Sequence, residues 1–325
     1  MSEENKAFIS ISDVAGLSKP LTKLIDTLSK GTNIITTPWQ TKRNAKADAQ
    51  AIDTLAQSLN NVPGDLTYTN PNFSITVKKD SIEMTAVTRL IQTEVNRQIN
   101  INEIVRKTAL ILEQKDNVSP EPVEEDWINR YINIAKDITN EKMQNLWAQI
   151  LAGEVEHPHS YSYRTLDFLK NLTSAEATVI QDIFKHTFAA NGGIVYLFGG
   201  KKYLDSINIP FIYQLLLEEL NLATFSLKLT INKHSEEYYR IANTANFLKI
   251  SNYSDKDIDF EVSKLSSLGG EILKLTPPQF DKNNLTSHLS FLNKQGIKYE
   301  LIENVEFLDN DQIQWCDDAI SIIEI

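Results

Sequence analysis

The residues best suited to metal chemistry in this 325-residue chain are His157 and His159, which flank Pro158 and follow Glu154 and Glu156. Imidazole and carboxylate groups can ligate zinc or manganese. The proline favours an extended loop, however, and no third His or Cys lies at ligand spacing. We therefore interpret the segment as an ordinary polar loop and expect neither a metal site nor a bound cofactor.

The single cysteine and the glycine-rich segments give no catalytic pattern either. Cys316 precedes Asp317 and Asp318, and neighbouring carboxylates disfavour formation of the reactive thiolate. The segment GGKK at residues 199–202 lacks the spacing of a P-loop, and no G-x-G-x-x-G motif is present. We therefore expect no catalytic residues, and an enzyme whose site forms only on oligomerisation is the second alternative function.

Composition limits the remaining function classes. The chain carries 32 Lys and Arg residues against 43 Asp and Glu residues, a formal net charge of −11. Nucleic-acid binding needs clustered cations that displace counterions from phosphates, so this acidic balance disfavours it. No apolar run approaches the roughly 18 residues of a membrane-spanning helix, and the N-terminus lacks the pattern of a secretory signal. With one cysteine as well, the sequence predicts a cytoplasmic protein.

An amphipathic helix is predicted over residues 13–30. Its apolar face includes Leu17, Leu21, Leu24 and Leu28, which recur at helical spacing, while lysines lie on or beside the other face. This pattern favours packing in the core or in a homo-oligomer. It leaves open a peripheral contact of residues 13–30 with a membrane surface.

A second helix, predicted over residues 41–60, carries a small basic cluster of Lys42, Arg43 and Lys46. The first helices are therefore the one region where nucleic acid or anionic lipid is electrostatically permitted. Three cations are a weak footprint for DNA binding. A DNA-binding regulator is accordingly the alternative function rather than the leading one.

The middle of the chain is predicted to be helical, with helices at about 81–115, 123–138 and 140–154. The polar residues around Asn100 interrupt the apolar periodicity, which predicts a break or kink there. Together with the segments before them, these helices predict a helical domain over residues 1–157.

After residue 157 short helices alternate with strand-like segments, among them 225–231 and 239–250. This alternation predicts a winged-helix-like α+β domain over residues 158–325, with a small C-terminal βαβ-like appendage. The helix at about 209–220 is mostly apolar, and we expect its apolar face to be buried. The fold class is thus mainly α with a C-terminal α+β part.

Three motifs in the middle of the chain carry a resemblance: EPVEEDW at 121–127, LWAQILAGE at 146–154 and RTLDFLKNLT at 164–173. On these motifs the chain resembles the bacterial domain-of-unknown-function family 2806, most strongly over residues 81–180. Members of that family are often met in prophage or anti-phage gene neighbourhoods. The resemblance therefore implies, by association, a role in phage–host conflict.

Five residues of these motifs have the properties of structural positions: Asp126, Trp127, Trp147, Gly153 and Arg164. A carboxylate in the first turn of a helix suits the helix dipole, and tryptophans anchor packing. The glycine suits a helix end or a close backbone approach, and Arg164 is positioned to pair with Glu154 or Glu156.

The leading hypothesis from the sequence is a non-enzymatic interaction or effector protein in phage–host conflict. It would act through self-association, a protein partner or a membrane-active N-terminal helix.

Overall fold

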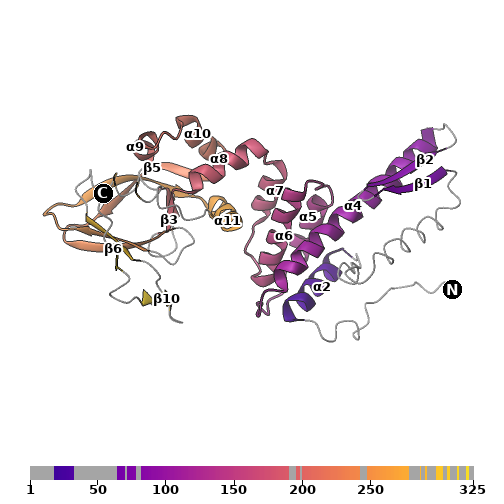
Figure 1. The fold of residues 1–325 in the computed structure, drawn as a ribbon, viewed down its shortest axis with the longest axis horizontal. Helices are drawn as coiled ribbons and strands as arrows, with labels where there is room; N and C mark the ends of the chain where they lie inside the picture. Colours follow the sequence, from indigo (N-terminus) through magenta and orange to yellow (C-terminus); the bar gives the residue numbers. More distant parts are fainter. Residues whose placement is uncertain are drawn as a thin grey trace. The chain divides into compact units, whose positions relative to one another are not determined.

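The computed structural model describes residues 18–32, 64–69, 72–77, 82–189, 195–197, 200–241, 247–277, 286, 290, 298–302, 306–307, 313–314 and 320–321. The chain divides into two compact units, residues 1–166 and 167–325 (Figure 1). The division falls inside helix α7 (Tyr163–Asn171), whereas the boundary predicted at residue 157 lies before this helix.

The first unit is built from helices and one β-hairpin. The described elements are α2 (Lys19–Thr32), β1 (Gly64–Thr69), β2 (Asn72–Val77), α4 (Ile82–Leu112), α5 (Glu125–Ala135) and α6 (Glu141–Glu156). Helix α4 packs along α6, and α2 packs against α5 and α6. The strands β1 and β2 pair in antiparallel register, and β2 also contacts α4 (Figure 1). The helical character predicted for this part is confirmed, while the predicted helix at 41–60 lies outside the described residues.

Helix α4 continues without interruption through Asn100, so the break predicted there is wrong. The Asn100 side chain donates a 2.9 Å hydrogen bond to the carbonyl oxygen of Lys136, just after the end of α5. Nearby, Arg97 contacts Asp137 at 2.7 Å. The polar residues in this stretch blur the hydrophobic periodicity because their partners are polar groups at the end of a neighbouring helix.

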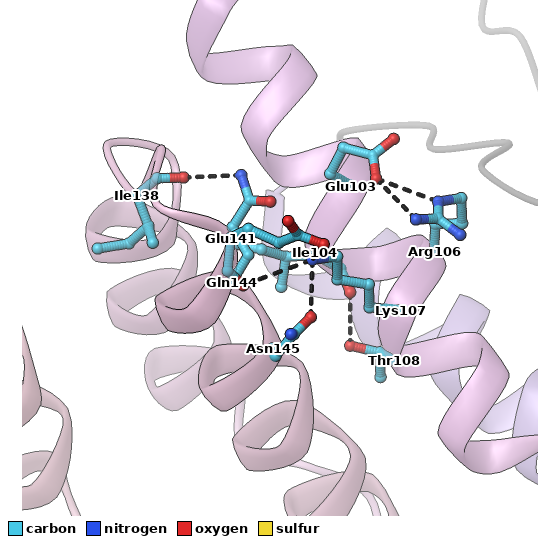
Figure 2. A network of polar contacts seen from close by, with 9 residues as sticks. All are labelled: Glu103, Ile104, Arg106, Lys107, Thr108, Ile138, Glu141, Gln144 and Asn145. Carbon is cyan, nitrogen blue, oxygen red and sulfur yellow. Dashed lines mark hydrogen bonds and ion pairs between the residues drawn. The ribbon is translucent and has the colours of Figure 1, made fainter. Parts of the chain in front are cut away.

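A second polar network joins α4 to α6 (Figure 2). The Lys107 side chain is only 13% exposed, and its Nζ donates to Asn145 Oδ1 at 2.7 Å and to the carbonyl oxygen of Glu141 at 3.5 Å. Buried Thr108 donates to the carbonyl oxygens of Ile104 at 2.9 Å and Ala148 at 3.3 Å. Because a half-buried ammonium must keep its acceptors, this network fixes how α4 lies on α6.

The second unit contains short helices and an antiparallel sheet. The helices are α8 (Ser174–Phe184), α9 (Gly200–Ser206), α10 (Phe211–Glu219) and α11 (Ser267–Leu275). The strands are β3 (Thr187–Ala189), β4 (Val195–Leu197), β5 (Ala223–Ile231), β6 (Ser235–Ile241), β7 (Phe247–Asn252), β8 (Ile258–Leu265), β9 (Lys298–Ile302), β10 (Glu306–Phe307), β11 (Ile313–Gln314) and β12 (Ile320–Ser321).

Eight of these strands form one sheet in the order β12-β9-β7-β6-β3-β4-β8-β5. Within the segment predicted as one strand, 239–250, the described residues 239–241 belong to β6 and 247–250 to β7, and these two strands pair antiparallel. Strand β9 pairs antiparallel with β7, and β12 pairs antiparallel with β9. These C-terminal strands therefore extend the same sheet, whereas a βαβ unit would pair its strands in parallel.

One apolar cluster holds this sheet together. Its buried members come from β3, β5, β6, β7, β8 and β9: Phe188, Ile231, Tyr239, Leu248, Ile250, Phe260, Val262 and Leu301. Strands far apart in the strand order share this core.

Strand β5 is an edge strand of the sheet. Its register with β8 shifts between Thr224 and Leu227, and Ser226 within this bulge has φ 61°. The exposed Lys228 further along β5 pairs with Asp259 of β8 at 2.7 Å.

The helices of the second unit begin with a reciprocal cap. Thr173 Oγ1 accepts from the backbone N–H of Glu176 at 3.2 Å, and the Glu176 carboxylate accepts from the backbone N–H of Thr173 at 2.8 Å. This reciprocal pair of hydrogen bonds is a capping box at the start of α8. Helices α9 and α10 follow β4, and both contact β5.

Candidate functional site

Two of the three motifs that carry the family resemblance contribute a tryptophan to a buried aromatic stack of the first unit. The rings of Trp127 and Tyr131 lie 5.2 Å apart and nearly parallel, and those of Tyr131 and Trp147 lie 5.3 Å apart with a 50° tilt. All three side chains are buried. Trp127 and Tyr131 come from α5 and Trp147 from α6, so the stack joins these two helices.

Two of the three polar tips of this stack have hydrogen-bond partners. Trp127 Nε1 donates to the carbonyl oxygen of Tyr161 at 2.7 Å, and Tyr131 Oη donates to the carbonyl oxygen of Trp147 at 2.7 Å. Burial raises the pKa of the Tyr131 hydroxyl well above its usual range, which keeps it a neutral donor. Trp147 Nε1 is buried and has no hydrogen-bond partner among the described residues.

Gly153 is required by the close approach of Tyr161. A Cβ at position 153 would lie 2.8 Å from Tyr161 Cε2, closer than real Cβ atoms come to a neighbour. The Gly153 position is inside α6, three residues before the helix ends. Of the two roles expected for this glycine, the geometry therefore gives it close approach to an aromatic ring.

Glu154 is a buried carboxylate that holds the loop after α6. It accepts hydrogen bonds from the backbone N–H groups of His159 at 2.6 Å and Tyr161 at 3.0 Å. Burial raises the pKa of the Glu154 carboxyl, and these hydrogen bonds act in the opposite direction. Its lone pairs serve the backbone of the loop, so Glu154 is not placed as a metal ligand.

The two histidines of the loop face different carboxylates. His159 Nε2 lies 3.3 Å from Glu121 Oε1, while His157 Nε2 lies 3.9 Å from Glu156 Oε1. Among the described residues no group of three or more His, Cys, Asp or Glu side chains could hold a metal ion. The loop is a structural turn in which His159 has φ 67°.

The expected pairing of Arg164 with Glu154 or Glu156 is absent from the described ion pairs. Glu156 instead pairs with Lys115 at 3.0 Å, and Arg164 is exposed in the first turn of α7. Asp126 is exposed in the first turn of α5, where its charge suits the helix dipole. Neither residue takes part in the aromatic stack.

The leucine face of α2 lies inside the first unit. Leu21, Leu24 and Leu28 are buried, and α2 packs against α5 and α6. Beside them Lys23 Nζ donates to the carbonyl oxygen of Ser119 at 2.7 Å, and burial lowers the pKa of this ammonium group. The three leucines thus serve internal packing and are not presented to a membrane or a partner.

The other candidate interaction residues, Leu17, Lys42, Arg43 and Lys46, lie outside the described residues, as does Cys316. Within the part of the chain that the structure describes, no helix is long and apolar enough to cross a membrane.

The structure reveals one apolar surface that sequence reasoning missed. On α10, Phe211 is 47% exposed, Ile212 is 63% exposed and Leu215 is 41% exposed. Exposed Glu218 and Glu219 continue the same side of the helix, and we call these five residues the α10 face. The buried residues of this helix are Gln214 and Leu217, and Leu217 lies on the side away from the α10 face. The expectation that the apolar face of this helix is buried is therefore wrong for these three side chains.

The reason is that α10 is apolar on more than one side. Its sequence, FIYQLLLEE, has apolar residues around most of its circumference, so periodicity alone does not show which of them face the core. The observed orientation places Leu217 inside and leaves Ile212 exposed. One feature of the sequence does indicate the exposed side. Glu218 and Glu219 are charged, and they lie three and four residues after Leu215, on the same side of the helix.

Comparison with known protein families gives a match. The model of a family described as "Protein of unknown function (DUF2806)" matches residues 85–289, more than half of the chain. The matched range contains both the aromatic stack and the α10 face. No curated protein and no solved structure matches the chain.

Proposed function

This chain belongs to the DUF2806 family, and we propose that it is a non-enzymatic interaction protein that binds a protein partner through the α10 face. The observation that carries the proposal is the exposure of Phe211, Ile212 and Leu215 on one side of a single short helix. Single exposed apolar residues are ordinary, whereas adjacent large ones mark interaction surfaces.

Burial of this face in a complex is favourable because it removes apolar surface from water. Complete burial of an exposed Phe, Ile or Leu side chain stabilises by about 1.5–3 kcal/mol, and roughly half of that remains to be gained here, since these side chains are 41–63% exposed. Three such side chains on neighbouring positions can therefore supply the anchor of an interface, while polar residues around them form its rim.

We also infer that the second unit contains a winged-helix-like core. Its support is the order α8, β3, β4, α9, α10, β5, β8 along the chain, together with the adjacency of β4, β8 and β5, in that order, in the sheet. The β6–β7 pair is inserted between β5 and β8 in the sequence, but in the sheet it lies next to β3. In this arrangement α10 takes the place of the recognition helix of a helix-turn-helix pair.

The composition of α10 favours a protein over DNA as its partner. A recognition helix that reads DNA works next to phosphates, and Lys or Arg side chains supply the attraction. Helix α10 has no Lys or Arg and ends in Glu218 and Glu219. A winged-helix regulator of DNA is the alternative, since the strand order supports it.

The proposal is tested by comparing two exposed apolar positions. Ile212→Glu places a charge on the α10 face. Tyr253→Glu is the control, because it introduces the same charge elsewhere in the second unit, at a side chain that is 59% exposed, against 63% for Ile212. In native cells, proteins crosslinked to the wild-type chain are expected to persist with Tyr253→Glu and to be lost with Ile212→Glu. Recovery of the same proteins with both variants would contradict the proposal.

A direct binding measurement distinguishes the DNA-binding regulator from the protein-binding function. The purified chain is mixed with duplex DNA at low salt, where electrostatic binding is strongest. We expect no binding that depends on the α10 face. Salt-sensitive binding that Ile212→Glu abolishes would favour the DNA-binding regulator instead.

We further propose that the interaction serves phage–host conflict, with the family resemblance as its support. Bacteria expressing the wild-type chain or Tyr253→Glu are expected to differ from control cells in plaque formation, and bacteria expressing Ile212→Glu to match the control cells. Equal plaque numbers in all of these strains would contradict the role in phage–host conflict. The proposed interaction through the α10 face would still be decided by the crosslinking experiment.

A further inference from the structure

The α10 face has an apolar half and an acidic half. Phe211 and Leu215 are four residues apart and adjacent on the helix surface, and Ile212 lies beside them. Glu218 and Glu219 follow on the same side, one turn further along. Nine residues of helix span about 13 Å, so the whole face matches two to three turns of a partner helix.

The acidic half has the stronger negative potential because it coincides with the end of the helix. The aligned peptide dipoles give a helix C-terminus a partial negative charge, and the two carboxylates add to it. No cation lies on α10 itself to neutralise them. A partner is therefore favoured that places Lys or Arg next to this end of the helix.

We propose that the α10 face binds an amphipathic helical segment of a partner protein whose apolar stripe is flanked by Lys or Arg. This inference rests on the proposed function and names the chemistry of the partner. The apolar side chains of that segment pack on Phe211, Ile212 and Leu215, and its cations lie against Glu218 and Glu219.

Charge also favours a basic helical segment over a second copy of the chain as the binding partner. Two copies that met through the α10 face would each bring the same two carboxylates and no cation from α10. Each copy has a formal net charge of −11, so the approach of two copies is opposed at low ionic strength. A basic segment gains from the same field that repels a copy.

The test uses the full chain and two synthetic helical peptides with the same leucine stripe. One peptide has lysines beside the stripe and the other has glutamates. Fluorescence anisotropy is expected to show that the lysine peptide binds at least about tenfold more tightly than the glutamate peptide. Ile212→Glu is expected to weaken binding of the lysine peptide by at least about tenfold, whereas Tyr253→Glu leaves it unchanged.

A charge-reversed variant tests whether Glu218 and Glu219 determine the preference for the lysine peptide. Glu218→Lys combined with Glu219→Lys changes only exposed side chains, and circular dichroism checks that it folds. The peptide preference is expected to invert in this variant. Equal binding of both peptides, or an unchanged preference in the reversed variant, would overturn the inference.

Sedimentation of the chain alone tests the second copy as occupant. A dimer that Ile212→Glu dissociates would also overturn the inference, because the α10 face would then bind its own counterpart. These failures are distinguishable from failure of the proposed function, in which Ile212→Glu leaves every crosslinked partner in place. If the partner is lost but no charge preference exists, the proposed function stands and only this inference fails.

Discussion

The indole Nε1 of Trp127 donates a 2.7 Å hydrogen bond to the carbonyl oxygen of Tyr161, and this bond ties α5 to the loop that precedes α7. Glu154, at the end of α6, accepts from the backbone N–H of the same Tyr161. Two of the three sequence motifs of the family resemblance, 121–127 and 146–154, therefore meet at the loop that leads into the third. Their residues act together in the fold of the first unit, which accounts for long motifs that carry no catalytic pattern.

Replacement of Trp127 by phenylalanine is predicted to destabilise the protein by about 1–3 kcal/mol, because a buried carbonyl oxygen of Tyr161 loses its donor. Urea unfolding followed by far-UV circular dichroism measures the change. Tyr163→Phe is the matched control, since Tyr163 is only partly buried and its hydroxyl contacts exposed Glu124 at 3.3 Å. A Trp127→Phe variant as stable as the control would show that this hydrogen bond contributes little.

Substitution of glycine by alanine is predicted to have opposite effects at two helical positions. Gly153→Ala is expected to cost about 1–3 kcal/mol, because its Cβ would crowd the buried ring of Tyr161. Gly270→Ala in α11 meets nothing within 4 Å and is expected to stabilise by about 0.5–1 kcal/mol. Thermal unfolding of both variants checks the pair, and equal shifts in Tm would contradict the crowding argument.

The buried carboxyl of Glu154 predicts a pH dependence of stability. Because its folded-state pKa is raised above 4.5, the native state binds more protons than the unfolded state between 4.5 and that raised value. Its contribution to the free energy of unfolding therefore falls as the pH rises through this window. Glu154→Gln is expected to remove this part of the slope, and to lose about 1–3 kcal/mol at neutral pH because one backbone N–H loses its acceptor.

The measurement is the free energy of unfolding of wild type and variant at a series of pH values across that window. Glu125→Gln serves as the control, since Glu125 is exposed in the first turn of α5. A Glu154→Gln variant with the same slope as wild type would show that this carboxyl does not titrate differently on folding.

The leucine face of α2 is predicted to act through stability and not through lipid. Leu24→Ala is expected to cost about 2–5 kcal/mol because Leu24 is buried against the other helices. Lys19→Ala, at an exposed position of the same helix, is expected to change stability little. Chemical denaturation gives both values, and flotation with anionic vesicles checks lipid binding. Unchanged stability with lost vesicle binding in Leu24→Ala would assign the face to the membrane.

Local signals in the sequence predict much of the fold. The spacing of Thr173 and Glu176 is typical of a capping box, and the box forms because both partners are close in sequence and need no tertiary contact. The helices of the first unit follow apolar periodicity, which is also local. The predicted break at Asn100 fails because its polar side chain has a partner 36 residues away, at Lys136.

The candidate site depends on tertiary contacts and was therefore less predictable. Which side of α10 faces the core is decided by the sheet and the neighbouring helices, not by its own composition. The same holds for Glu154, whose role as a backbone acceptor depends on the path of a loop after it. The eight-strand order of the sheet joins strands far apart in the chain, and no local pattern specifies such an order.

The bulge in strand β5 has a consequence for the behaviour of the protein at high concentration. In the described part of the chain β5 is hydrogen-bonded to a strand on one side only, so its free side is a template for the strand of another molecule. At Ser226 the backbone turns to φ 61°, and this interrupts the regular spacing of its N–H and C=O groups. A second chain can align with only part of the strand, which protects the crowded protein from growing into ordered β-aggregates.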